Sequence, residues 1–147
     1  MRKLVDHKNS SEKGQSLVEL ALSFTILLML LAGAIDFGRA FFTWVSLRDA
    51  AQEGAAYGSI DPTNLGEIEN RVYSILESSG AVPEPRTNVV ITRTFFGPAC
   101  LGNIIQIEVD YLTFPLTVPF LGSIIGSDTL SIQSTIQDTI LKPTCGQ

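Results

Sequence analysis

The chain has 147 residues, enough for about one domain, and its 10 Lys+Arg against 15 Asp+Glu give a formal net charge of −5. An apolar fraction of 45% with 17% charged residues argues against intrinsic disorder, which needs low hydrophobicity and high charge. The chain has fewer basic than acidic residues, which argues against nucleic-acid binding. Two Cys, two Met and one His leave few soft ligands for a metal or redox centre.

The first predicted element is a membrane-spanning helix at about residues 17–35. Residues 20–35 contain no charged side chain. With Leu17 and Val18, which Glu19 separates from the rest, the segment reaches about 19 residues, or roughly 28 Å of helix, close to a hydrocarbon core of ~30 Å. The alternative is a buried core helix, which rarely carries so many consecutive apolar residues. Four basic residues precede the run: Arg2, Lys3, Lys8 and Lys13. The positive-inside rule therefore places the N-terminus in the cytoplasm and the rest outside.

Two processing routes are compatible with this N-terminus. The sequence Ala32-Gly33-Ala34 matches a signal-peptidase pattern, and a cut after Ala34 would release a secreted binding or adhesion module. The other cut lies between Gly14 and Gln15, behind a short basic leader. Glu19 is then the fifth residue after the cut and precedes the apolar run. This second arrangement resembles the type IV prepilin site. A third possibility is an ordinary single-pass membrane protein that never polymerises.

Three segments together resemble the TadE-like family, the pseudopilins of tight-adherence (Tad, or Flp) pilus systems. They are Gly14-Gln15-Ser16-Leu17-Val18-Glu19-Leu20-Ala21-Leu22, Ala34-Ile35-Asp36-Phe37-Gly38-Arg39-Ala40 and Leu47-Arg48-Asp49-Ala50-Ala51-Gln52-Glu53-Gly54-Ala55. The third segment follows a family pattern of the form A-A-x-E-G-A-R, in which Ala56 replaces the usual Arg.

The resemblance implies a minor pseudopilin, a structural component of a pilus or related secretion filament and not an enzyme. It implies a prepilin peptidase that cuts after Gly14, and an inner-membrane location with entry into an extracellular pilus. Implied partners are other pilins, chiefly a major Flp pilin, together with an inner-membrane platform and a cytoplasmic ATPase. It also implies an assembly role for Glu19, through pairing with the amine freed at Gln15 of a neighbouring subunit. The alternative for Glu19 is a carboxylate at headgroup level.

The first helix is expected to continue beyond the membrane. Residues 36–57 contain no Pro and many helix formers, so a single helix over 15–58 would be roughly 65 Å long. Asp36 and Arg39 are three residues apart and either pair on one helix face or face headgroups or water. Gly54 and Gly58 have the spacing of a close-packing motif, but we expect Gly58 to act as a C-terminal cap.

Residues 59–147 predict a small exported α+β domain, after a leader at 1–14 and the helix at 15–58. An amphipathic stripe predicts a helix from Leu65 to about residue 78, capped by Thr63 or Asn64, and 83–85 reads as a loop. Alternating segments predict an antiparallel sheet of three to four strands, at 88–96, 105–111 and 130–140. Between them, residues 112–126 predict an apolar loop on the sheet, or a patch that contacts membrane or another subunit.

The remaining side chains give no catalytic or metal site. Cys100 and Cys145 lie in the predicted exported part, where a disulfide is favoured; two free buried thiols are the alternative. His7, the only histidine, lies in the leader, so no Ser-His or Cys-His pair forms within one mature chain. Glu108 and Asp110 read as a solvated sheet face. We therefore expect no metal, no cofactor and no small-molecule substrate, and membrane lipid as a partner.

Overall fold

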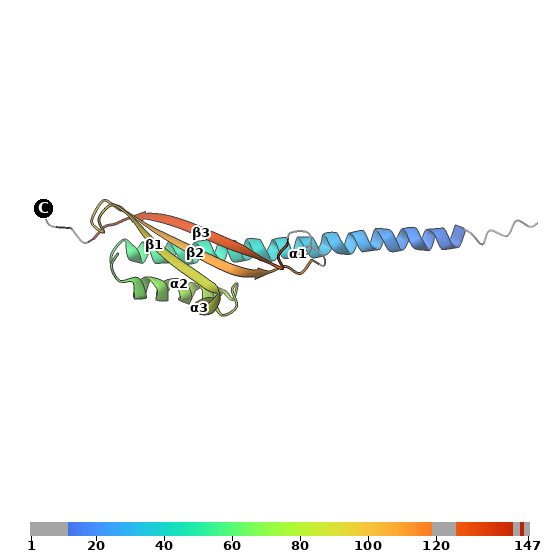
Figure 1. The fold of residues 1–147 in the computed structure, drawn as a ribbon, viewed down its shortest axis with the longest axis horizontal. Helices are drawn as coiled ribbons and strands as arrows, with labels where there is room; N and C mark the ends of the chain where they lie inside the picture. The colour runs from blue at the N-terminus through green and yellow to red at the C-terminus, as the bar shows by residue number, and fades with distance from the viewer. Residues whose placement is uncertain (1–11, 119–125, 143–144, 146–147) are drawn as a thin grey trace, which may run out of the picture.

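The structure, a computed structural model, describes residues 12–118, 126–142 and 145. Its elements, in chain order, are α1 (Glu12–Gly58), α2 (Leu65–Ser79), α3 (Pro85–Asn88), β1 (Val89–Phe96), β2 (Ile104–Pro115) and β3 (Thr129–Thr139). Figure 1 shows that α1 runs the length of the molecule. Its N-terminal part projects alone, and its C-terminal part lies beside the sheet and α2. At 1.5 Å per residue, its 47 residues span about 70 Å.

The two parts of α1 have different surroundings. The described side chains of residues 14–31 are all exposed, and the most apolar 18-residue window of the helix has a hydropathy of 2.3 with none of it buried. From Asp36 onward one side of α1 becomes buried, and Leu47, Ala50 and Ala51 are fully inaccessible. Among the described residues, α1 is the one helix long and apolar enough to cross a membrane. The predicted long apolar helix is confirmed.

The rest of the described chain is an antiparallel three-stranded sheet with two helices packed on it. The strand order is β1-β2-β3; α1 lies along β2 and β3, and α2 packs against α1. Along β2 the alternate residues Ile105, Ile107, Val109 and Tyr111 are buried, as the period of two predicts. They form one core with the buried residues of α1 and α2. The predicted α+β class is confirmed, with three strands.

The sequence signals of α2 are present in the structure. Asn64, one of the two predicted caps, accepts a hydrogen bond from the backbone N–H of Glu67 at 3.2 Å through its Oδ1 atom. The stripe Ile68, Val72 and Leu76 is buried. Gly80 ends the helix with φ of 64°, a left-handed conformation that glycine adopts without steric cost.

Two connections differ from the prediction. The expected loop at 83–85 leads into α3, which begins at Pro85, because the fixed φ of proline suits the first helical position. The apolar loop predicted at 112–126 starts later than expected, because residues 112–115 belong to β2. After a register irregularity, Phe114 pairs with Leu130 and Pro115 with Thr129, and the proline at the strand's last residue interrupts no further pairing. Residues 119–125 of that predicted loop lie outside the described residues.

The expected cap role of Gly58 is wrong. Gly58 is the last residue of α1 but does not adopt a left-handed φ. A Cβ at this position would stand 2.6 Å from Cδ1 of Ile105, and a Cβ at Gly54 would stand 2.7 Å from Cγ2 of Val72. Both glycines therefore let α1 approach its neighbours closely, Gly58 against β2 and Gly54 against α2.

Candidate assembly helix and its junction with the sheet

The predicted processing and assembly residues lie on the first exposed turns of α1. Gly14, Gln15 and Glu19 are all exposed, and a Cβ at Gly14 would meet nothing within 4 Å. Gln15 and Glu19 are four residues apart and share one face of the helix. They line a shallow surface hollow together with Val18 and Leu22. The structure thus presents these residues on an uncovered helix face.

At the other end of the apolar run, Asp36 joins α1 to the segment that follows β2. The residue is 6% exposed. Oδ2 accepts hydrogen bonds from the backbone N–H groups of Thr117 at 2.6 Å and Val118 at 2.9 Å. Oδ1 is 3.3 Å from Nη1 of Arg39. One side chain therefore fixes α1 against a segment about eighty residues later in the chain.

This environment favours the ionised form of Asp36. Burial alone would raise the pKa of the carboxyl group. The hydrogen bonds from the backbone of Val118 and Thr117, with smaller contributions from the Thr117 side chain and the Arg39 guanidinium, outweigh burial. The pKa of Asp36 is therefore lowered from its ordinary value.

Arg39 extends the same junction toward the end of β2. Its Nη1 atom donates to Oγ1 of Thr117 at 2.6 Å, and its Cζ atom lies 5.3 Å from the ring centroid of Phe114. The spacing in the sequence suggested the contact between Asp36 and Arg39. It gave no signal of Thr117, Val118 or Phe114, because those contacts join residues far apart in the chain.

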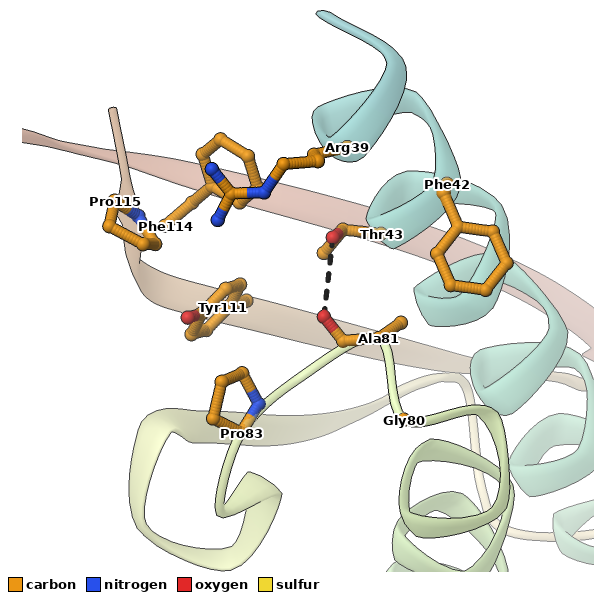
Figure 2. Close-up of a pocket in the computed structure, with 9 residues that line it drawn as sticks. All are labelled: Arg39, Phe42, Thr43, Gly80, Ala81, Pro83, Tyr111, Phe114 and Pro115. Atoms are coloured by element: carbon orange, nitrogen blue, oxygen red, sulfur yellow. Dashed lines mark hydrogen bonds between the residues drawn. The ribbon is translucent and has the colours of Figure 1, made fainter. Parts of the chain in front are cut away.

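A cavity of about 260 Å³ lies directly beside this junction. Its walls come from α1 through Arg39, Phe42 and Thr43, from residues 80–83, and from β2 through Tyr111 and Phe114. Figure 2 shows the Arg39 guanidinium at one border of the cavity, near the rings of Tyr111 and Phe114. One turn further along α1, the Thr43 hydroxyl donates to the backbone carbonyl of Ala81 at 3.4 Å. The cavity is thus mostly aromatic and aliphatic, with one cation at its edge.

Comparison with known proteins places these residues in a family. Residues 14–56, less than a third of the chain, match the family model for TadE-like protein. The N-terminal helix is TadE-like. No curated protein and no solved structure matches the chain. The TadE-like match covers Gly14, Glu19, Asp36 and Arg39, and it relates this helix to proteins associated with Tad pili. That family is structural.

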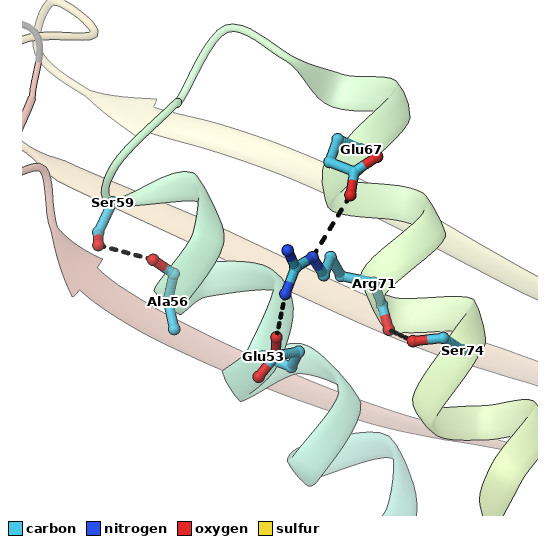
Figure 3. Close-up of polar contacts among 6 residues, drawn as sticks. All are labelled: Glu53, Ala56, Ser59, Glu67, Arg71 and Ser74. Atoms are coloured by element: carbon cyan, nitrogen blue, oxygen red, sulfur yellow. Dashed lines mark hydrogen bonds and ion pairs between the residues drawn. The ribbon is translucent and has the colours of Figure 1, made fainter.

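The end of the TadE-like match contains the position where Ala56 replaces the usual Arg. Glu53, three residues earlier, pairs with a guanidinium from another element. Nη1 of Arg71, on α2, lies 3.1 Å from Oε1 of Glu53, and its Nε atom lies 3.4 Å from Oε1 of Glu67, as Figure 3 shows. All three side chains are substantially exposed, so each pair contributes little to stability. Arg71 nonetheless supplies Glu53 with a cation that Ala56 does not.

The two cysteines, which lie outside the TadE-like match, are bonded to each other. Cys100 and Cys145 form a disulfide, with their Cα atoms 5.4 Å apart. The bond ties the connection between β1 and β2 to the chain after β3. Nearby, the backbone N–H of Gly102 donates to the carbonyl of Ile140 at 2.9 Å, and the N–H of Ile140 donates to the carbonyl of Asn103 at 2.8 Å. The disulfide therefore lies at the end of the sheet farthest from Asp36.

Proposed function

We propose that the protein is a minor pseudopilin, a structural subunit in the assembly of a Tad/Flp pilus or a related secretion filament. It is inserted with its N-terminus in the cytoplasm and its sheet outside, and a prepilin peptidase removes residues 1–14. The proposal deepens the pilus association that the family match gives. Its partners are then a major Flp pilin, the prepilin peptidase and the inner-membrane platform.

The observation that carries the proposal is the position of the family match on the helix. The match begins at Gly14, the residue that precedes the expected cut. It then runs along the part of α1 whose apolar side chains are covered by no other described residues. A helix of this kind needs an external apolar environment. Lipid supplies it before assembly, and the helices of neighbouring subunits supply it afterwards, so the same surface serves both states.

The packing of α1 from Asp36 onward favours this cut over release of a secreted module. Both cuts fall inside α1, but cleavage after Ala34 falls two residues before the buried carboxylate of Asp36. The new terminus at Ile35 would then lie within one turn of the Asp36 hydrogen bonds. Cleavage after Gly14 leaves the whole packed part of α1 intact. The boundary expected after residue 58 separates two stretches of sequence. The α1 residues Leu47 and Ala51 nevertheless belong to the same core as the sheet.

The proposed processing is tested by the N-terminal mass of Gly14→Ala expressed with a prepilin peptidase. We expect the wild type to begin at Gln15 and the variant to keep residues 1–14, because a prepilin peptidase cleft has little room for a Cβ. Gly38→Ala is the matched control, since Gly38 is also exposed on α1 with open space around it. Normal maturation of Gly14→Ala, a wild-type start at Ile35 or an uncut wild type would each contradict the proposal.

A further inference from the structure

We propose that the cavity beside Arg39 binds the phosphate headgroup of a bilayer phospholipid. The inference rests on the membrane insertion proposed above and assigns a ligand to the junction between the span and the sheet. The first argument is depth. Arg39 follows the end of the apolar run by four residues, about 6 Å of helix. The headgroup layer on each side of a bilayer is about 5–7 Å thick, so the guanidinium lies within it.

The second argument is the free edge of the guanidinium. Nη1 of Arg39 is occupied by Asp36 and Thr117. The N–H groups of Nε and Nη2 donate to no described residue. These two nitrogens form one side of the planar fork that binds a phosphate with two parallel hydrogen bonds. The side chain is 45% exposed, so this edge is accessible.

The third argument is that the surrounding contacts hold the guanidinium in place. The Phe114 ring beneath Cζ and the two acceptors on Nη1 fix the plane of the group. Asp36 contacts the guanidinium only at Nη1, and its Oδ2 atom is turned to the N–H groups of Thr117 and Val118, so the Nε and Nη2 edge stays open to an anion. A fixed guanidinium loses less entropy when it binds an anion.

The cavity itself suits a small headgroup better than a larger ligand. Its volume of about 260 Å³ is below the ~300–1,000 Å³ of drug-sized ligand sites. The apolar walls formed by Phe42, Tyr111 and Phe114 lower the local dielectric on one side of the guanidinium, which strengthens its contact with a phosphate. Among the nine lining residues, Arg39 is the one charged residue, so an anion is the complementary ligand.

The experiment is native mass spectrometry of the full chain in nonionic detergent with added phosphatidylglycerol. We expect one retained phosphatidylglycerol per chain. Diacylglycerol with the same acyl chains, which lacks the phosphate, and free glycerol phosphate, which lacks the chains, are the other two arms. Equal retention of diacylglycerol would show binding by acyl chains alone and would overturn the proposal. Equal binding of glycerol phosphate would overturn the lipid as the source of the anion.

Variants locate the site on the protein. Arg39→Gln is expected to lower phosphatidylglycerol retention by about tenfold or more, because the paired charged hydrogen bonds are lost. Arg48→Gln, on the same helix but outside the cavity lining, should retain lipid as the wild type does. Ala81→Phe fills the cavity and leaves Arg39 unchanged, so it tests the site even where Arg39→Gln disturbs the fold. Wild-type retention in Ala81→Phe, or equal loss in Arg48→Gln, would contradict the assignment.

The same spectra separate this proposal from the pseudopilin function. The chain mass reports where the N-terminus lies, and the lipid adduct reports the headgroup site. A wild type that begins at Ile35 contradicts the proposed function. A chain that begins at Gln15 and retains no phosphatidylglycerol contradicts the headgroup site alone.

Discussion

The carboxylate of Asp36 accepts a hydrogen bond of 2.6 Å from the backbone N–H of Thr117, across 81 residues of sequence. Asp36 lies where the exposed apolar part of α1 meets its packed part, and Thr117 lies just after β2. The bond therefore joins the end of the apolar helix to the nearest end of the sheet. It sets the direction in which the sheet leaves the membrane in the proposed topology.

The first prediction is that Asp36→Ala destabilises the packed region by about 2–4 kcal/mol. The substitution removes two hydrogen bonds to a charged carboxylate, each worth about 1.5–3 kcal/mol. Thr117 is exposed and Val118 half-buried, so water replaces part of this loss. Asp36→Asn keeps one acceptor oxygen and should lose less. Urea unfolding of the full chain in detergent, followed by the fluorescence of Trp44, the one tryptophan, measures the difference. Asp49→Ala, an exposed position on α1, is the control, and an equal loss there would contradict the prediction.

The second prediction concerns pH. The pKa of Asp36 is lowered in the folded chain, so its ionised form contributes stability above the unfolded pKa of about 3.9. That contribution is lost as the pH falls through the folded pKa. Hydrogen exchange at Thr117 and Val118, corrected with an unstructured peptide, should keep its protection through the ordinary aspartate pKa of about 3.9 and lose it only at lower pH. In Asp36→Asn the protection of these two amides should not change over the same interval. Identical pH profiles for the two proteins would refute the role of Asp36.

Local patterns in the sequence predicted most of the elements. The apolar run, the absence of proline and the helix formers predicted α1. The apolar stripe of α2 and the alternation in β2 predicted the faces that pack. These are short-range periodicities, set by 3.6 residues per helical turn and by two residues per strand repeat. The same spacing suggested the contact of Asp36 with Arg39.

The contacts that build the junction were beyond such patterns. Thr117 and Val118 bind Asp36 chiefly through their backbone N–H groups, which every non-proline residue possesses, so side-chain identity carries little signal. The partners of Gly54 and Gly58 depend on how α2 and β2 pack against α1. The cavity combines side chains from three separate segments. The Asp36 contacts, the glycine partners and the cavity all depend on packing between residues far apart in the chain. Patterns among neighbouring residues in a single sequence do not reveal such packing.

The third prediction contrasts glycines on α1. At Gly54 an added Cβ would stand 2.7 Å from Cγ2 of Val72, a branched and stiff side chain. At Gly58 the close atom is Cδ1 of Ile105, the end of a more flexible chain. Gly54→Ala should therefore lose about 1–3 kcal/mol of stability from overpacking, and Gly58→Ala should lose less. Gly38→Ala meets no atom within 4 Å and should be neutral or gain up to about 1 kcal/mol from helix propensity. Thermal unfolding of the three variants checks this order, and a stabilised Gly54→Ala would contradict it.

The fourth prediction concerns the Cys100–Cys145 disulfide. The two residues are 45 apart in sequence, and the chain-entropy model gives about 4 kcal/mol for a closed loop of this length. Non-reducing peptide mapping of the exported protein should recover the linked pair. The double variant Cys100→Ser/Cys145→Ser should unfold at lower urea concentration, and reducing agent should shift the wild type toward it. Two thiols that alkylate freely in the oxidised, denatured wild type would end this prediction.

The last prediction concerns Glu19, which is exposed on the apolar part of α1. A carboxylate deep in hydrocarbon costs about 2.5 kcal/mol or more, so Glu19→Ala should remain inserted in the membrane and still be cleaved. The cost of the native carboxylate is offset if it pairs with the amine freed at Gln15 of a neighbouring subunit. Glu19→Ala is therefore expected to mature and yet to fail to enter assemblies.

The assay is crosslinking and co-purification with the other pilus subunits, together with the N-terminal mass of each variant. Glu19→Gln keeps the size of the side chain and removes its charge, so it should assemble poorly if the ion pair matters. Ser23→Ala, one turn further along the same hollow, should assemble normally. Where Gln15 cyclises, the terminal amine loses its charge and the pairing becomes a neutral hydrogen bond; the N-terminal mass identifies that form. If the Glu19 carboxylate only lies at headgroup level, cleaved Glu19→Ala will enter assemblies at wild-type levels. That result would contradict the pairing role of Glu19.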